Sequence, residues 1–267
     1  MNNIVFCFSG TGNSLFAAKN ISKTLENCEI VSMTRSINLS KQYDSIGFVY
    51  PTYYWGMPKI VIKFIESLNL ENNKDAYYYS IATYGGLPGN AIYQLYEILE
   101  TKHNVKLHYG QKLKMFANYV IAYDMSKNVG VITNKSTKKL LPIINSIKLK
   151  KRNRVYKFTK IFKSMNENFV KNVSNMDKNY SIDDSCNYCF ICVKVCPVKN
   201  IEIIENKPIF KNNCEQCVAC IQFCPQKAIN YKDLTQKRKR YTNPEINYLE
   251  LFEHNNKENN GVRPNST

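Results

Sequence analysis

The stretch NIVFCFSGTGNSLFAAKNISKTL, residues 3–25, decides the fold, because it places a strand, a glycine-rich turn and a helix in immediate succession. Residues 4 to 8 form an apolar run of strand length. The helix after the turn has apolar residues at the spacings of three and four that mark one helical face: Leu15, Ala18, Ile21 and Leu25. Backbone N–H groups at a helix N-terminus attract anions, and hydroxyl groups in the turn add hydrogen bonds. The stretch therefore predicts an anion site.

The turn lacks the signatures of two common nucleotide loops. No Gly-Lys-Ser/Thr follows it, so it is not a Walker loop, and Gly10 and Gly12 have no third glycine at position 15, so it is not the dinucleotide G-x-G-x-x-G. The turn itself has no lysine or arginine, so its hydroxyls and amides would carry a phosphate.

Two more loops follow apolar strands. SIGFVYPTYYWGMP, residues 45–58, has a strand that ends at Tyr50, and AYYYSIATYGGLPGN, residues 76–90, has one that ends near Thr83. In a doubly wound sheet the carboxyl ends of parallel strands meet at one edge, where the ligand crevice lies. Aromatic side chains and glycines in these loops suit a flat ring such as an isoalloxazine. The alternative is that these aromatics are core residues, since the chain has 19 tyrosines.

The segment FSGTGNS resembles the phosphate loop of flavodoxins, and this resemblance implies FMN as a cofactor. It also implies a sheet with strand order 2-1-3-4-5. The predicted flavin-binding residues come from all three loops: Ser9, Thr11, Gly12, Asn13, Ser14, Pro51, Thr52, Tyr53, Tyr54, Trp55, Gly56, Thr83, Tyr84, Gly85 and Gly86.

The remaining N-terminal segments also alternate between strand and helix patterns. CEIVSM reads as a strand, KIVIKFIESL and AIYQLYEILETKH as amphipathic helices, and VKLHYGQKLKMFANYVIAY contains a further strand with an interruption. This alternation favours an α/β fold with a parallel sheet and helices on both faces. We expect a flavodoxin-like domain over residues 1–150.

Eight of the ten cysteines lie in two runs of one pattern, C-x2-C-x2-C-x3-C-P, at residues 186–197 and 214–225. Zinc sites generally use two ligand pairs separated by a longer loop, whereas three ligands from one tight loop suit a compact iron–sulfur cubane. The alternatives are a zinc knuckle or unrelated cysteines. Close cysteine spacing without a signal peptide favours metal ligation in a reducing cytoplasm.

Residues 181–231 resemble bacterial-type two-cluster ferredoxins, small α+β domains in which the fourth cysteine of each run serves the other [4Fe-4S] cluster. The resemblance implies one cluster on Cys186, Cys189, Cys192 and Cys224, and a second on Cys214, Cys217, Cys220 and Cys196. The chain as a whole resembles fusions of a flavodoxin-like domain with such a ferredoxin domain.

Two segments carry no cofactor motif. Residues 151–180 read as a basic amphipathic helical linker, which either packs on one of the domains or lies on an anionic membrane or an acidic partner. Residues 232–267, with KRKR at 237–240 and an Asn-rich end, read as a polar, mobile tail, and KRKR is too short to predict nucleic-acid binding.

The net charge of +16 lies mostly in the middle of the chain, between residues 111 and 180. A basic surface there would steer an acidic redox partner, and a solvated lysine-rich helix is the alternative. No run of apolar residues is long enough for a transmembrane helix. The oligomeric state is left open.

Together these features predict an electron carrier that passes single electrons between FMN, two [4Fe-4S] clusters and a protein redox partner. Two alternatives stay open: a flavin-dependent reductase of a small substrate that is fed through the clusters, and an iron–sulfur redox sensor. No catalytic residues are predicted, because the sequence shows no Ser/His/Asp, Cys/His or paired-carboxylate arrangement.

Overall fold

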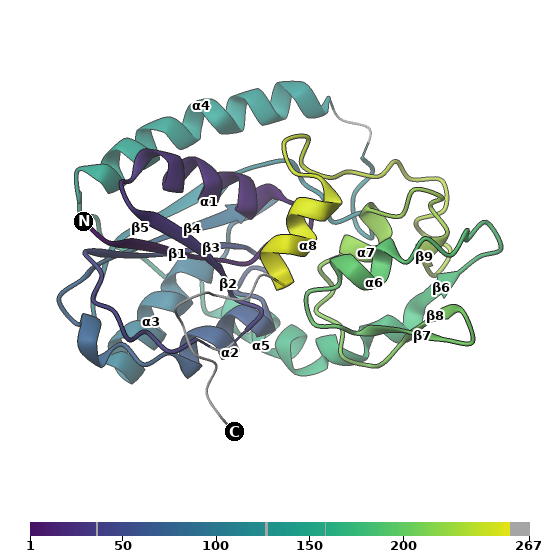
Figure 1. Ribbon diagram of the computed structural model, residues 1–267, viewed down its shortest axis with the longest axis horizontal. Helices are drawn as coiled ribbons and strands as arrows, with labels where there is room; N and C mark the ends of the chain where they lie inside the picture. The colour runs from purple at the N-terminus through teal and green to yellow at the C-terminus, as the bar shows by residue number, and fades with distance from the viewer. Residues whose placement is uncertain (36, 126–127, 158, 257–267) are drawn as a thin grey trace.

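A computed structural model describes residues 1–35, 37–125, 128–157 and 159–256. Its main element is a five-stranded parallel sheet in the order β2-β1-β3-β4-β5 (Figure 1). This is the predicted flavodoxin-like order, in which the ligand crevice lies at the carboxyl ends of the strands. The expectation of a doubly wound α/β fold is confirmed.

The elements of this part follow the alternation read from the sequence. They are β1 (Asn3–Cys7), α1 (Asn13–Thr24), β2 (Cys28–Ser32), β3 (Ser45–Pro51), α2 (Lys59–Ser67), the 3₁₀ helix η1 (Glu71–Asn73), β4 (Tyr77–Tyr84), α3 (Ala91–His103), β5 (Leu107–Lys114) and α4 (Val129–Lys148).

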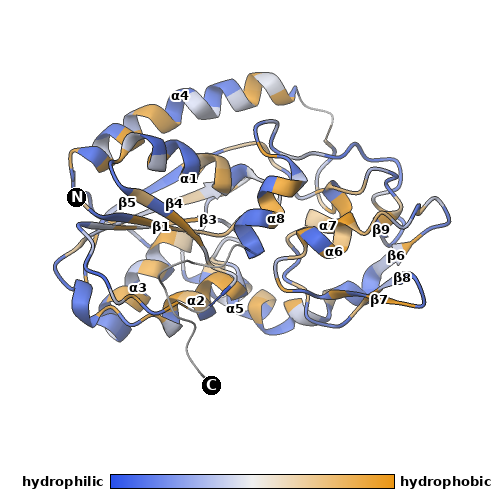
Figure 2. Ribbon diagram, viewed as in Figure 1, coloured by the Kyte–Doolittle hydropathy of each residue, from blue (hydrophilic) through white to orange (hydrophobic). Residues whose placement is uncertain are grey.

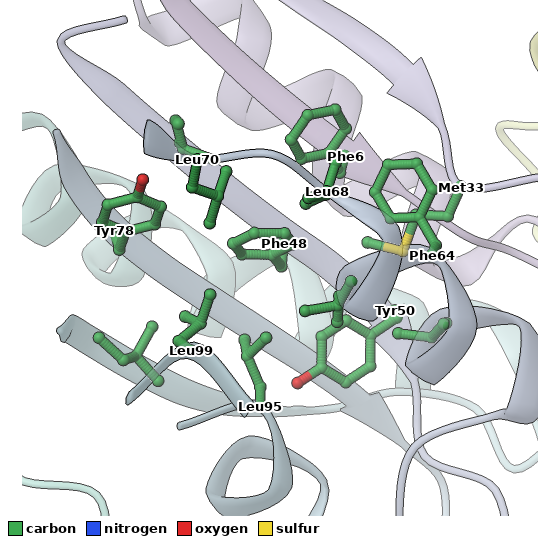
Figure 3. Close-up of a cluster of buried hydrophobic side chains, with 14 of the residues drawn as sticks. Phe6, Met33, Phe48, Tyr50, Phe64, Leu68, Leu70, Tyr78, Leu95 and Leu99 are labelled. Atoms are coloured by element: carbon green, nitrogen blue, oxygen red, sulfur yellow. The ribbon is translucent and has the colours of Figure 1, made fainter. Parts of the chain in front are cut away.

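Helices cover both faces of the sheet, so the central strands are apolar along their length. On one face, Phe6 of β1 and Phe48 of β3 pack with Phe64 of α2 and Leu95 of α3, as Figure 3 shows. On the other face, the core includes residues of α1 and α4, such as Phe16 of α1. Figure 2 shows the same pattern, with hydrophobic colours along β1 and hydrophilic colours on peripheral loops.

The cysteine-rich part adds short elements to one end of the sheet (Figure 1). They are β6 (Tyr180–Ile182), α6 (Ile191–Val195), β7 (Ile201–Ile204), β8 (Lys207–Phe210), α7 (Ala219–Gln222) and β9 (Ile229–Tyr231). β6 pairs with β9 and β7 with β8, both antiparallel. The helices α6 and α7, each within one cysteine run, lie side by side.

The segment between the two parts contains α5 (Lys160–Asn172) and the 3₁₀ helix η2 (Val173–Asn179). Its helix packs on the loop after β3. The side-chain amide of Asn166, 1% exposed, donates to the carbonyls of Tyr53 (3.0 Å) and Met57 (3.3 Å), and its oxygen accepts a bond from Gln94 (2.8 Å). This segment therefore packs on the sheet domain, which is one of its two predicted roles.

The expectation of a mobile tail is wrong for residues 232–256. These residues return from β9 to the sheet and end in α8 (Tyr248–Asn256), which lies against β2 and α6 (Figure 1). Leu251 is fully buried in the core beside α1, and Glu250 pairs with Lys19. The ring of His254 bonds the carbonyl of Cys7 (3.2 Å). Too few apolar residues mark this tail for their pattern to predict packing. Residues 257–267 lie outside the described residues.

Within the described ranges, no helix combines the length and apolar character needed to span a bilayer.

Candidate functional site: a pocket between the sheet and the cysteine loops

A cavity of about 290 Å³ lies at the carboxyl ends of β1, β3 and β4, the edge at which the sequence places a flavin. Thirteen of the fifteen predicted flavin-binding residues line it: Ser9, Thr11, Asn13, Ser14, Pro51, Thr52, Tyr53, Tyr54, Trp55, Thr83, Tyr84, Gly85 and Gly86. The three loops therefore meet in one place, as expected for loops that leave the same edge of a parallel sheet.

The turn after β1 presents hydroxyl groups near the N-terminus of α1. The Ser9 hydroxyl accepts the N–H of Gly12 (3.1 Å), which fixes the turn. The Thr11 oxygen accepts a bond from the amide of Asn118, so its O–H proton is free to donate to an anion. The hydroxyls of Ser14 and Thr83 are 2.9 Å apart, and one donates to the other. None of the described residues lining the pocket is charged, so hydroxyls and the helix N-terminus provide its anion-binding character.

The two predicted residues outside the cavity wall are both glycines that face other parts of the chain. Gly12 has φ +96°, a conformation that favours glycine, and a Cβ there would lie 2.9 Å from Asn243 and Ile246 of the C-terminal tail. A Cβ on Gly56 would lie within 2.4 Å of the Asn166 side chain. Both glycines permit close packing behind the pocket. The geometry therefore favours a packing role for them over the predicted contact with the flavin.

The aromatic turn after β3 is held in a strained conformation. Tyr54 and Trp55 both have positive φ, and Tyr53 and Gly56 exchange two backbone hydrogen bonds across the turn. Non-glycine residues in this region cost of the order of 1–3 kcal/mol each and persist only where packing imposes them. Here α5 supplies the packing. Phe169 stacks on Tyr54 at 4.2 Å between ring centroids, and Phe162 stacks on Trp55 at 5.3 Å.

A fourth loop, which was not predicted from the sequence, forms part of the cavity wall. It follows β5 and contributes Phe116, Ala117, Asn118, Tyr119, Ala122 and Tyr123. β5 is the next parallel strand, so its carboxyl end lies at the same edge of the sheet. The loop after this strand could therefore have been predicted from the sequence as part of the pocket. The Tyr119 hydroxyl lies 3.2 Å from that of Tyr54. Burial, and then the bond to Tyr54, raise the pKa of Tyr119, so this phenol stays protonated.

The C-terminal tail fixes the anion-binding turn from behind. The Asn13 amide oxygen accepts bonds from the Tyr241 hydroxyl (2.7 Å) and the Asn243 amide (3.1 Å). The N–H of Asn243 donates to the carbonyl of Thr11 (2.8 Å). Tyr241 also stacks on Phe116 at 4.3 Å. The predicted role of Asn13 as a cofactor ligand thus competes with a role in anchoring the tail.

Residues of the second cysteine run complete the wall. Gln216, Cys217 and Val218 line the cavity next to the turn after β1. Burial raises the pKa of Tyr53, which lies beside Cys217, well above its ordinary value. Nothing in the sequence spacing places a cysteine of this run at the sheet edge, because the contact joins segments about 200 residues apart.

The pocket fits a polar, ring-shaped ligand such as a flavin. The Oγ1 of Thr52 and the Oε1 of Gln216 are buried and have no hydrogen-bond partner among the described residues. Unpaired buried polar atoms are costly, by about 1–3 kcal/mol each, and a ligand that bonds to them would remove that cost. Aromatic rings and hydroxyls in the other walls suit the ring and phosphate of FMN.

Glu215 anchors the second cysteine run to the sheet domain. Its carboxylate accepts the N–H of Ile60 (3.2 Å) at the first turn of α2, where the helix dipole favours negative charge. Burial raises the pKa of Glu215 to about 7, and the bond from Ile60 and the charges of Lys59 and Lys63 oppose that rise.

The two cysteine runs adopt one repeated backbone conformation. Positive φ occurs at Tyr188 and Phe190 in the first run and at the equivalent Gln216 and Val218 in the second. It occurs again three residues after the fourth cysteine of each run, at Lys199 and Lys227. Left-handed residues in a short loop turn successive cysteines and N–H groups to one side. The N–H groups of Gln216 and Asn200 donate to the sulfurs of Cys214 and Cys196, both at 3.1 Å.

The cysteines associate in two sets of four. A small second cavity of about 20 Å³ is lined by three cysteines of the first run and the last of the second: Cys186, Cys189, Cys192 and Cys224. Burial raises the pKa of Cys192 to about 12, and the charges of those three partners add to the rise. Cys217 also has a strongly raised pKa, caused first by burial and then by Cys196, with Cys214 contributing.

Among the described residues, no three histidine, cysteine, aspartate or glutamate side chains are arranged to hold a metal ion. A single ion draws thiolate ligands to about 2.3 Å from one point, whereas a [4Fe-4S] cluster takes four thiolates around a larger core. Four cysteines around a cavity are compatible with the second arrangement.

Comparisons with known proteins find similarity in fold only. No family model matches the chain, and no curated protein matches it significantly. A candidate flavoprotein from Bacteroides uniformis is similar at TM-score 0.34 and 17% identity, covering 43% of this chain and 91% of that one. A second, from Bacteroides eggerthii, has TM-score 0.34 and 17% identity, covering 54% and 98%. The rubredoxin oxygen:oxidoreductase of Desulfovibrio gigas has TM-score 0.36 and 10% identity, covering 56% and 36%.

Proposed function

We propose that this chain is an electron-transfer protein that binds FMN and two [4Fe-4S] clusters and exchanges single electrons with a protein redox partner. The observation that carries the proposal is that Cys217, a predicted cluster ligand, lines the same cavity as the predicted phosphate turn. FMN supplies two-electron redox chemistry that can be released one electron at a time, and each cluster supplies one-electron chemistry.

The chain's own residues would bind, orient and shield these groups. Thr11 and the N-terminus of α1 would hold the phosphate, and Tyr54 and Trp55 would enclose the ring. The cysteine sets would hold the clusters, with N–H groups to sulfur and apolar neighbours tuning their potentials. Residues 1–150 would form the flavin domain, 151–180 the linker and 181–231 the cluster domain.

The cavity size favours an electron carrier over a reductase of small substrates. A volume of about 290 Å³ is close to the lower limit of the range for small-molecule sites, which is roughly 300–1,000 Å³. We infer that one cofactor would occupy most of a pocket of this size.

An anaerobic reductive titration of the full chain, reconstituted with iron, sulfide and FMN, tests the proposal. We expect one flavin and two clusters per chain, with visible and EPR spectra showing that added electrons equilibrate between them. Protein that binds clusters but no flavin would contradict the assignment of the pocket. Protein that binds flavin but no iron would contradict the assignment of the cysteines.

Thr11→Val tests the phosphate turn separately. Loss of a hydrogen bond to a charged group costs about 1.5–3 kcal/mol, so the Kd for FMN should rise roughly 10- to 150-fold. Riboflavin has no phosphate, so its affinity should be unchanged by the same substitution. Fluorescence titration measures both, and Thr101→Val on the exposed side of α3 is the matched control. Equal losses for FMN and riboflavin would show that Thr11 does not contact the phosphate.

A further inference from the structure

The two cysteine sets lie at different places relative to the pocket. Three consecutive residues of the second run, Gln216 to Val218, line it, whereas no residue of the first run does. A Cβ on Gly10 would lie 2.7 Å from the carbonyl oxygen of Cys217 and 3.0 Å from its Cβ. The turn after β1 therefore packs directly against the loop that carries Cys217.

The first run is in part exposed to solvent. Cys189 is exposed, and its neighbour Tyr188 is 48% exposed. The cavity lined by Cys186, Cys189, Cys192 and Cys224 is separate from the flavin pocket, since the two share no residue.

The two sets adjoin each other through the helices that carry their third cysteines, Cys192 and Cys220. These cysteines lie on α6 and α7, which pack side by side. The second cysteine run therefore lies between the flavin pocket and the first run, and the first run faces solvent.

We infer that Cys196, Cys214, Cys217 and Cys220 hold a flavin-proximal cluster, while Cys186, Cys189, Cys192 and Cys224 hold a solvent-side cluster that exchanges electrons with the partner. This inference rests on the proposed function. It identifies the partner as a one-electron redox protein that approaches the loop around Cys189. Two partner molecules, each oxidised by one electron, balance the full reduction of one flavin, with two protons taken from water.

Cys220→Ser and Cys192→Ser provide a matched test. They alter the third cysteine of each run, and neither residue lines the flavin pocket. Both full-length variants are reconstituted anaerobically, and their FMN and iron contents are measured first. The flavin midpoint potential, from a potentiometric titration, is the main readout. It should shift in Cys220→Ser, because a charged cluster beside the flavin is lost, and remain near the wild-type value in Cys192→Ser.

The exchange with an external protein supplies a second readout. Electron delivery from the reduced protein to cytochrome c should be lost in Cys192→Ser, while its flavin still equilibrates with the remaining cluster. A flavin potential that shifts only in Cys192→Ser, or equally in both variants, would overturn the inference. Cys214→Ser and Cys186→Ser, at the first position of each run, replace any variant that fails to fold. Wild-type protein without bound FMN would instead refute the proposed function.

Discussion

Gly10→Ala should weaken FMN binding strongly, because the added methyl group meets a backbone atom. The new Cβ would lie 2.7 Å from the carbonyl oxygen of Cys217 and 2.9 Å from the hydroxyl of Tyr53. A side-chain hydroxyl can rotate away, but a carbonyl oxygen moves only with its loop. Such overpacking costs about 1–3 kcal/mol, which corresponds to roughly a 5- to 150-fold rise in Kd if the strain is relieved by opening the pocket.

Fluorescence titration with FMN measures the affinity of Gly10→Ala, and thermal unfolding shows whether the fold is retained. Gly130→Ala is the matched control, because its Cβ would be 3.6 Å from the nearest other atom and should be accommodated. Wild-type affinity in Gly10→Ala, with unchanged stability, would mean that the turn and the cysteine loop are not in contact.

Leu251→Ala should destabilise the protein by about 2–5 kcal/mol, the usual cost of truncating a leucine in a core. Leu251 lies on α8, in the tail, and is fully buried against the sheet face that α1 and α4 cover. Urea unfolding followed by circular dichroism gives the free energy of unfolding. The measured value tests whether the tail is part of the folded core.

Leu249→Ala is the control for this substitution, because it removes the same atoms from the same helix at a position that is 48% exposed. Its effect should stay within about 0.5 kcal/mol, as for other surface positions. If Leu251→Ala were as harmless as Leu249→Ala, α8 would not be docked. A loss of FMN affinity together with stability in Leu251→Ala would agree with the bonds from Tyr241 and Asn243 to Asn13.

Residues 3–25 by themselves determined the strand, turn and helix around which the sheet is built. Apolar runs of strand length and helical spacing are local features, so they also indicated β3, β4 and the helices that follow them. The rule that parallel strands end at one edge then brought the three predicted loops together. The cysteine spacing is likewise local, and its resemblance to two-cluster ferredoxins implied that Cys196 and Cys224 would each belong to the set of the other run.

Only the tertiary structure decided what closes the pocket. The loop of Cys217 packs against Gly10, and the N–H of Asn243 donates to the carbonyl of Thr11. Phe169 stacks on Tyr54, and all three contacts join segments that are far apart in the chain. No periodicity encodes such contacts, because they depend on how whole elements pack. The tail was misread for the same reason: its polar residues, such as Asn243, are buried through specific hydrogen bonds and not through an apolar pattern. Local pattern therefore fixed the strands and loops, while long-range packing decided which of their residues face the pocket.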